Sequence, residues 1–233
     1  MNIVITGATK GIGRAIAQKF AEEGANIAVC ARNEEDLKSM ADEFKIGFPT
    51  INFIYKKADV SIRTELTDFG EMVLEHFDQI DVLVNNAGVF MPGNIHDEPE
   101  GALEKQINTN VYSAYHLTRQ LLPRFIKQKD GHIFNMCSVA SIKAYPNGGS
   151  YSISKFALLG FSKALREEMK PHHVRVTSLL PGATLTASWE GVDLPEDRFM
   201  KSSDLGKMVY DVWQLSKNTV IEEIVMRPQL GDI

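Results

Sequence analysis

The sequence predicts an α/β protein built on a parallel sheet whose strands are connected by helices. Short runs rich in β-branched residues alternate with longer segments of helical periodicity throughout the 233 residues. Most of the short runs are apolar at consecutive positions, as expected for strands that are buried on both faces. A chain of this length commonly forms one α/β domain, so one domain is expected over residues 1–233.

Strands and helices are expected in alternating order. The strands are expected at residues 2–6, 26–31, 51–58, 81–85, 131–137, 174–180 and 221–226. The helices are expected at about 12–23, 34–45, 61–77, 100–128, 151–170 and 204–216. The stretch from 183 to 202 has no clear periodicity, and loops of that length are usually functional or mobile.

Several helix boundaries have their own signals. Asn33, Ser61 and Ser203 precede helical segments and are expected to cap them. The acids at 34–36 suit the positive end of the helix dipole. Pro123 falls within the fourth helical segment, where a proline is expected to kink the helix or to begin a new segment.

The composition is that of an ordinary soluble protein, with 44% hydrophobic residues, 24% charged residues and a net charge of −5. The mild acidity argues against a nucleic-acid or anionic-membrane partner, and no apolar run is long enough to span a bilayer. The first strand begins at Asn2, so no signal peptide is expected. Cys30 and Cys137 fit neither a disulfide framework nor a metal site, which favours a reducing, cytoplasmic location.

A glycine-rich loop follows the first strand. It reads Thr6-Gly7-Ala8-Thr9-Lys10-Gly11-Ile12-Gly13 and continues into a helix. Glycines let a backbone turn tightly and approach a pyrophosphate, and the helix N-terminus offers free N–H donors to it. The spacing could also belong to an ordinary strand–helix turn, but its position directly after the first strand favours a nucleotide site.

The end of the second strand indicates which nucleotide is bound. An NAD site usually has a carboxylate there for the adenosine ribose, whereas this chain has Arg32. Arg32 and Lys10 could bind a 2′-phosphate, which favours NADP(H) over NAD, although either could be a solvated surface cation. After the third strand, Asp59 could accept from the adenine amino group while Val60 packs on the ring, or Asp59 could cap the next helix.

Tyr151 and Lys155 lie one helical turn apart, thirteen residues after Ser138. A phenol, an ammonium and a hydroxyl beside a dinucleotide form a proton-transfer set for carbonyl reduction or alcohol oxidation. Alone, Tyr151 and Lys155 are typical of an amphipathic helix, and Ser138 is typical of a strand-end cap. Together with the glycine loop, the three residues indicate a catalytic site.

The chain resembles the short-chain dehydrogenase/reductase family over essentially its whole length. The matching motifs are Thr6-Gly7-x3-Gly11-Ile12-Gly13, Asn85-Asn86-Ala87-Gly88, Asn110, Ser138, Tyr151-x3-Lys155 and Pro181-Gly182. The resemblance implies a three-layer Rossmann fold with helices on both faces of a seven-stranded parallel sheet in the order 3-2-1-4-5-6-7. The cofactor contacts it implies are Asn86, Ala87 and Gly88 on the adenine ribose side, Pro181 and Gly182 against the nicotinamide, and Thr184 and Thr186 beyond them, with Thr186 and the residue before Ser188 close to the carboxamide.

Four residues would then carry the chemistry. Tyr151 is the acid in reduction and the base in oxidation, and Lys155 at ~5 Å is expected to lower its pKa by roughly two units. Ser138 would orient the substrate oxygen, and Lys155 would also bind the nicotinamide ribose. By the resemblance, Asn110 sits in a helix and holds a water that relays protons to Lys155. Asn108 is the rival for that position.

A largely apolar substrate is expected, because three loops that should line the pocket carry bulky side chains. These are Phe90, Met91, Ile142, Tyr145, Leu185, Trp189, Phe199 and Met200, with Trp189 as the first choice for a substrate contact and a substrate loop at about 183–203. The two long helices at 100–128 and 151–170 resemble the subunit-pairing helices of the family. Tyr112, Tyr115, Phe156 and Phe161 would then lie in the interface of a homodimer or homotetramer.

These features predict an NADP(H)-dependent oxidoreductase, a carbonyl reductase, with no metal. The enzyme alternatives are an NAD-dependent alcohol dehydrogenase and a reductase of 3-oxoacyl chains on a carrier protein. Carrier docking would use basic residues, of which Arg124, Lys127, Lys129, Arg166 and Lys170 are available, unless they are simply solvated. A protein that binds NADP as a sensor or scaffold is the alternative outside enzymes.

Overall fold

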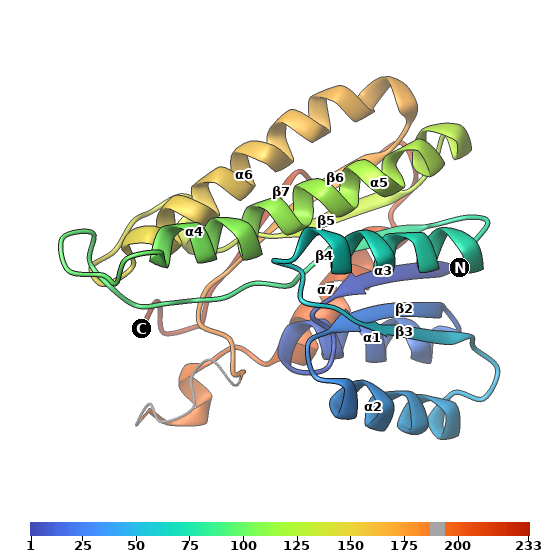
Figure 1. Ribbon diagram of the computed structural model, residues 1–233, viewed down its shortest axis with the longest axis horizontal. Coiled ribbons are helices and arrows are strands. Elements are labelled where there is room, and N and C mark those ends of the chain that lie inside the picture. The colour runs from blue at the N-terminus through green and yellow to red at the C-terminus, as the bar shows by residue number, and fades with distance from the viewer. Residues whose placement is uncertain (187–193) are drawn as a thin grey trace.

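The computed structural model describes residues 1–186 and 194–233 (Figure 1). Its centre is one seven-stranded parallel sheet in the order β3-β2-β1-β4-β5-β6-β7, which confirms the expected topology. The strands are β1 (Asn2–Thr6), β2 (Asn26–Ala31), β3 (Phe53–Lys57), β4 (Val82–Asn85), β5 (His132–Met136), β6 (Arg175–Pro181) and β7 (Glu223–Met226). The order reverses between β1 and β4, and in such sheets ligands bind beyond the carboxyl ends of the strands at that point.

Helices cover both faces of the sheet. They are α1 (Gly11–Glu22), α2 (Glu34–Gly47), α3 (Arg63–His76), α4 (Ala102–Ile107), α5 (Ser113–Gln128), α6 (Gly149–Met169) and α7 (Ser202–Gln214). One core packs α1, α2 and α7 against the sheet through Phe20, Phe44 and Val209. The other packs α3, α5 and α6 through residues that include Phe69 and Phe125. No described helix is long and apolar enough to cross a membrane.

The helix expected at 100–128 is divided into two. A π-helical turn, Asn108–Tyr112, separates α4 from α5. Pro123 does not begin a new segment, because α5 continues through it as an α-helix. Pro123 lies on the exposed side of α5, where water can satisfy the carbonyl that the proline leaves without a partner.

One of the three expected helix caps is confirmed and two are wrong. The Asn33 side chain accepts hydrogen bonds from the backbone N–H groups at the start of α2. Ser61 instead donates both its N–H and its hydroxyl to Asp59, and Ile62 caps α3. Ser203 lies inside the first turn of α7, whose N-cap is Lys201. Both serines lie within two positions of the true cap, a shift that propensity alone does not resolve.

Buried polar side chains connect the central strands to α5 and α6. Asn85 Nδ2 donates to Thr118 Oγ1 at 2.9 Å and to Asn135 Oδ1 at 2.8 Å. Asn135 Nδ2 donates to Ser162 Oγ at 2.9 Å, which also accepts from Ser178 Oγ at 2.7 Å. These bonds fix the lateral positions of β4, β5 and β6 under the two helices, because a buried polar atom left without a partner is costly.

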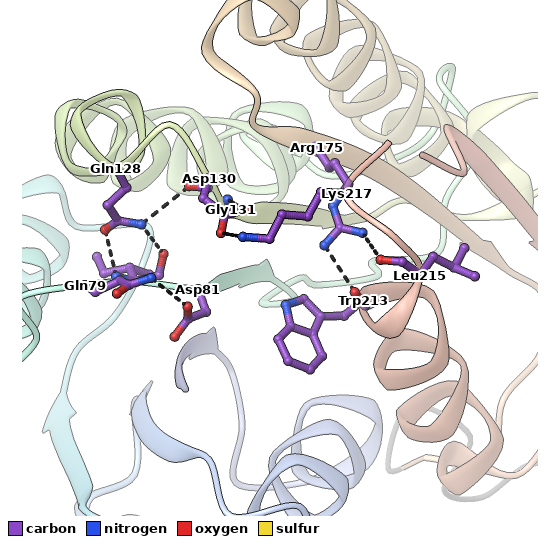
Figure 2. Close-up of polar contacts among 10 residues, drawn as sticks. Gln79, Asp81, Gln128, Asp130, Gly131, Arg175, Trp213, Leu215 and Lys217 are labelled. Atoms are coloured by element: carbon purple, nitrogen blue, oxygen red, sulfur yellow. Dashed lines mark hydrogen bonds and ion pairs between the residues drawn. The ribbon is translucent and has the colours of Figure 1, made fainter. Parts of the chain in front are cut away.

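The amino ends of β5 and β6 are held by a second network (Figure 2). Arg175, at the start of β6, donates to the Leu215 carbonyl at 3.0 Å and the Trp213 carbonyl at 3.1 Å, and so caps the end of α7. Lys217 pairs with Asp130 beside it. This network supports the amino edge of the sheet, and the opposite edge is the one that can bind ligands.

His132 begins β5 and is fully buried. Thr177 Oγ1 donates to the Ile221 carbonyl at 2.6 Å, so it accepts from His132 Nε2 at 2.7 Å, and His132 is the Nε2–H tautomer. The ring stacks on Phe134 with centroids 4.0 Å apart. Burial, and then the nearby positive charge of Arg175, hold the pKa of His132 well below its usual value.

Candidate active site

The predicted glycine loop joins β1 to α1, and its glycines have steric reasons to be glycine. Gly7 and Gly11 have φ angles of 67° and 57°, a region that side chains rarely allow. A Cβ on Gly13 would lie 2.4 Å from the Gly7 carbonyl oxygen and 2.5 Å from Asn86 Nδ2. The loop, which includes Thr9, Lys10 and Ile12, therefore packs tightly against neighbouring residues. Its glycines leave the backbone at the start of α1 uncovered by side chains.

Asn86 fastens this loop to the end of β4. Its Nδ2 donates to the Thr6 and Gly7 carbonyl oxygens, both at 2.9 Å. In return, Thr6 Oγ1 accepts from the N–H groups of Asn86 at 3.1 Å and Ala87 at 3.0 Å. Both N–H groups of the Asn86 side-chain amide therefore bond the protein backbone. Asn86 holds the loop beside the predicted ribose site, and these two donors are not available to a ribose.

A cavity of about 540 Å³ opens at the end of β2, where the 2′-phosphate of a cofactor was predicted. Its lining residues are Arg32, Asn33, Glu34, Glu35, Lys38 and Lys57. Lys38 pairs with Glu34 at 2.9 Å, whereas Arg32 forms no ion pair within residues 1–186 and 194–233. Arg32 is exposed and is available to an anion in this cavity.

Lys10 and Lys57 modify the predicted set of cations. Lys10 reaches Asp36 at 3.2 Å, so part of its charge is neutralised within the protein. Lys57 ends β3 and lines the cavity beside Arg32, although the sequence reasoning did not include it. The sequence did contain a signal for Lys57, because it ends the expected strand next to the one that Arg32 follows, and the carboxyl ends of neighbouring parallel strands meet at one edge of a sheet.

Asp59 follows β3 and closes a local turn. Its Oδ1 accepts from the Ser61 N–H at 2.9 Å and from the Ser61 hydroxyl at 2.7 Å, and its N–H donates to Glu65 Oε2 at 2.7 Å. Val60, which was predicted to pack on an adenine, is buried. The helix-capping interpretation of Asp59 is wrong, because the N-cap of α3 is Ile62 and no side chain caps the helix, and contact with an adenine stays a prediction.

Ser138, Tyr151 and Lys155 converge at the carboxyl end of β5. Ser138 Oγ accepts from the Ala140 N–H at 3.1 Å. The Tyr151 hydroxyl lies beside Ser138, which favours its phenolate form. Lys155 Nζ lies 5.7 Å from the centroid of the Tyr151 ring and donates to the Met136 carbonyl at 2.8 Å. The structure therefore brings together the three side chains that the sequence singled out.

The electrostatics of this cluster differ from the expectation. Burial raises the pKa of Tyr151, and the hydrogen bond from Ser138 only partly opposes it. Burial also lowers the pKa of Lys155 to about 8. The expected lowering of the Tyr151 pKa by Lys155 is not observed, because removal from water penalises both charged forms.

Asn110 lies in the π-helical turn and is buried. Its Oδ1 accepts from the Val89 N–H at 2.8 Å, and its Nδ2 donates to the Val89 carbonyl at 3.0 Å and to Ser154 Oγ at 2.9 Å. A Cβ on Gly88 would lie 3.3 Å from Asn110 Oδ1 and 3.5 Å from Lys155 Nζ. Asn110 is thus close to Lys155 and fixes the segment after β4.

The segment after β6 reaches both the C-terminal residues and the glycine loop. The Gly182 N–H donates to the Met226 carbonyl at 2.8 Å, and buried Thr184 donates its hydroxyl to the Gly182 carbonyl at 3.1 Å. A Cβ on Gly11 would lie 3.0 Å from Thr186 Cγ2. Thr186 therefore lies against the glycine loop, and Pro181, Gly182 and Thr184 lie in the segment that leads to it. The residue before Ser188, and Trp189, lie outside the described residues.

The predicted pocket side chains divide into two groups. Phe90, Ile142, Tyr145 and Leu185 are exposed. Phe90 lies edge-on to Tyr151, with ring centroids 4.9 Å apart. Phe199 is buried in the packing of the protein, whereas Met91 and Met200 are half-buried.

Comparison with known proteins places this geometry in a family. Residues 1–196 match the family model described as short chain dehydrogenase. Sepiapterin reductase of Chlorobaculum tepidum is 34% identical over 239 residues, which cover 99% of this chain and 97% of that protein. Among solved structures, an alcohol dehydrogenase from the archaeon Thermococcus sibiricus complexed with 5-hydroxy-NADP has a TM-score of 0.91 and 27% identity, covering 100% of this chain and 98% of that one. L-Sorbose reductase from Gluconobacter frateurii, complexed with NADPH and L-sorbose, has a TM-score of 0.90 and 27% identity, covering 97% and 95%. The chain belongs to the short-chain dehydrogenase family of oxidoreductases.

Proposed function

We propose that this protein is an NADPH-dependent carbonyl reductase whose residues 1–233 form one catalytic domain. The observation that carries the proposal is the convergence of Ser138, Tyr151 and Lys155 at the carboxyl end of β5, two strands from β1 and its glycine loop. Such a cluster can orient a carbonyl oxygen and deliver a proton to it. When bound, the nicotinamide supplies the hydride.

The residues present fit a dinucleotide phosphate. The bare backbone at Gly7, Gly11 and Gly13 suits a pyrophosphate at the start of α1. Arg32, which has no ion-pair partner in the part of the chain that the structure describes, offers a planar guanidinium to a 2′-phosphate in the cavity at the end of β2. The relatives crystallised with 5-hydroxy-NADP and NADPH support the same cofactor class for this chain.

The protonation states favour reduction. The raised pKa of Tyr151 keeps its phenol protonated near neutral pH, which is the form that an acid catalyst needs. When substrate binds, the Ser138 hydroxyl donates to the substrate oxygen in place of Tyr151 and so aligns that oxygen with Tyr151. Lys155, with a pKa of about 8, remains largely protonated at pH 7, where it stabilises the charge that develops as Tyr151 gives up its proton.

The substrate is proposed to be largely apolar. Phe90, Ile142, Tyr145 and Leu185 expose large apolar surfaces, and Phe90 lies against the proposed acid Tyr151. The carrier-protein alternative has less support, because three of its five basic residues are engaged within the protein. Arg124 donates to backbone carbonyls, Arg166 pairs with Glu222 and Lys170 pairs with Glu167.

A homodimer or homotetramer is proposed from the exposed faces of α5 and α6. Tyr112 and Phe156 are 51% and 46% exposed, and Tyr115 on α5 is also exposed. Sedimentation velocity at micromolar concentration tests the proposal, and a monomer alone would contradict it. A reducing, cytoplasmic setting is proposed from the two thiols, because burial raises the pKa of Cys30 to about 12 and of Cys137 to about 11.

The experiment that tests the function is NADPH oxidation with a panel of ketones, aldehydes, quinones and 3-oxoacyl thioesters. At least one carbonyl compound should be reduced, and Tyr151→Phe should abolish turnover while binding NADPH with nearly unchanged affinity. Equal activity in that variant would remove Tyr151 from the mechanism. NADPH binding without turnover of any compound in the panel would instead support the sensor or scaffold alternative. A preference for NADH with an alcohol would support the NAD-dependent dehydrogenase.

A further inference from the structure

The helix that carries Tyr151 begins without a cap of its own. The N-cap of α6 is Gly148, which has no side chain, and no acidic residue lies in the first turn. The first N–H groups of a helix have no partners within it and must find them elsewhere. Tyr151 is the third residue of α6, so any looseness in this turn moves its hydroxyl directly.

A segment far away in the sequence supplies the missing partners. The Gly149 N–H donates to the Gly93 carbonyl at 2.9 Å. Glu98 accepts from Ser150 twice, through the Ser150 N–H at 3.4 Å and through the Ser150 hydroxyl. The loop between β4 and α4, which contains Gly93 and Glu98, runs beside the start of α6 at the left of Figure 1. A carboxylate at this end of a helix is also favoured by the helix dipole.

The loop folds tightly on itself and lies close to the start of α6. Within the loop, a Cβ on Gly93 would lie 2.8 Å from Cβ of Glu98. A Cβ on Gly149 would lie 3.0 Å from Cγ1 and 3.1 Å from the backbone nitrogen of Ile95. Ser150 is 1% exposed and Glu98 is half-buried, so the charge-assisted hydrogen bonds between them are partly shielded from water. The loop and the first turn of α6 therefore form a tightly packed contact with a defined geometry.

We propose that Glu98 is a positioning residue for catalysis, which sets the place of the Tyr151 hydroxyl by holding the first turn of α6 through Ser150. The inference rests on the proposed role of Tyr151. Glu98 has no part in proton transfer itself, because its carboxylate is occupied by Ser150. Its effect should appear in the rate of the chemical step and leave cofactor binding unchanged, since the glycine loop lies on the other side of the sheet switch point.

Glu98→Ala should lower kcat by roughly 10- to 100-fold, because small misplacements of a catalytic group cost factors of this size. The Kd for NADPH should stay within about twofold of the wild-type value. Glu98→Gln should restore much of the rate, because its amide oxygen can still accept from Ser150. Asp97→Ala is the matched control and should leave kcat unchanged, since Asp97 is a neighbouring exposed carboxylate whose polar contacts in the described residues are with Asn94 and His96.

Two further measurements separate positioning from general stability. Hydrogen exchange at the Gly149 and Ser150 amides should accelerate in Glu98→Ala, with exchange in the central strands unchanged. In a double-mutant cycle, Ser150→Ala should add little to the loss caused by Glu98→Ala, because the two act through one contact. Additive losses, or unchanged exchange at these amides, would overturn the inference.

The test also distinguishes this inference from the proposed function. Tyr151→Phe is measured in the same assay. If that variant is inactive and Glu98→Ala keeps the wild-type kcat, the inference fails and the proposed function stands. If Tyr151→Phe is active, the proposed function fails, and with it the reason to expect an effect from Glu98.

Discussion

Replacement of Arg32 by alanine should weaken NADPH binding and leave NADH binding nearly unchanged. Arg32 and Lys57 are the exposed cations of the cavity at the end of β2 for which the described residues provide no ion-pair partner, and Arg32 carries the planar guanidinium. A charge-assisted hydrogen bond contributes about 1.5–3 kcal/mol, which corresponds to roughly 10- to 150-fold in affinity. Because the cavity is open to solvent, the loss should lie near the lower value, about tenfold, and should shrink as salt is raised.

Titration of each variant with NADPH and with NADH, at low and high salt, measures the effect as a ratio of dissociation constants. Lys10→Ala removes the same charge from a residue that already pairs with Asp36, and it should change the ratio less. Arg32→Lys keeps the charge and loses the planar fork, so an intermediate ratio is expected. An unchanged ratio in Arg32→Ala would refute the assignment of Arg32 to the 2′-phosphate. A change in Lys57→Ala alone would assign 2′-phosphate binding to Lys57 at the end of β3.

Three further predictions concern the loop, the amino edge of the sheet and the oligomer. Gly13→Ala places a methyl group 2.4 Å from the Gly7 carbonyl oxygen, so the variant should lose NADPH binding and about 2–4 kcal/mol of unfolding free energy. Wild-type values in calorimetric titration with NADPH and in urea denaturation would contradict this and show that the loop can move to accept the methyl group. Because the pKa of His132 is lowered in the folded protein, the unfolded chain takes up the proton first, and the free energy of unfolding should fall as pH drops below about 6.5. Between pH 6.5 and pH 5, His132→Gln should lose about 1.5 kcal/mol less unfolding free energy than the wild type, as measured by urea denaturation. Parallel stability curves for the two proteins would contradict this. Phe156→Glu puts a charge on the exposed face of α6 and should shift sedimentation towards the monomer while NADPH affinity persists, whereas an unchanged sedimentation coefficient would place the interface elsewhere.

Most of the fold could be predicted because its signals are local. Strands buried on both faces read as continuous apolar runs, and every strand was found within two residues of its observed bounds. The division of the helix at 100–128 could not be predicted, since its apolar periodicity continues across the π-helical turn Asn108–Tyr112. That turn contains Asn110, whose side chain bonds the backbone of Val89 twenty-one residues away in the sequence. A contact of this range leaves no trace in a helical pattern.

The candidate site shows the same division. The motif residues Ser138, Tyr151 and Lys155 meet as expected, because their positions depend on strand ends and one helical turn. The direction of the Tyr151 pKa shift could not be predicted, because it depends on burial, and burial depends on the whole packing. Glu98 was not anticipated either, since its partner lies fifty-two residues later. Its only local signal is a carboxylate in a loop, which is common on any protein surface.

The commitment of Asn86 to the main chain has a consequence for how mutagenesis of this enzyme is interpreted. Its amide bonds the Thr6 and Gly7 carbonyl oxygens, so Asn86→Asp would set a negative carboxylate against two oxygen acceptors and push the turn open. NADPH affinity would then fall because the turn had opened, and the loss by itself would not identify Asn86 as a cofactor contact. Affinity measurements on such variants report whether the glycine-rich loop keeps its conformation. A ligand contact should be inferred only when the structure of the apo-enzyme is unchanged by the substitution.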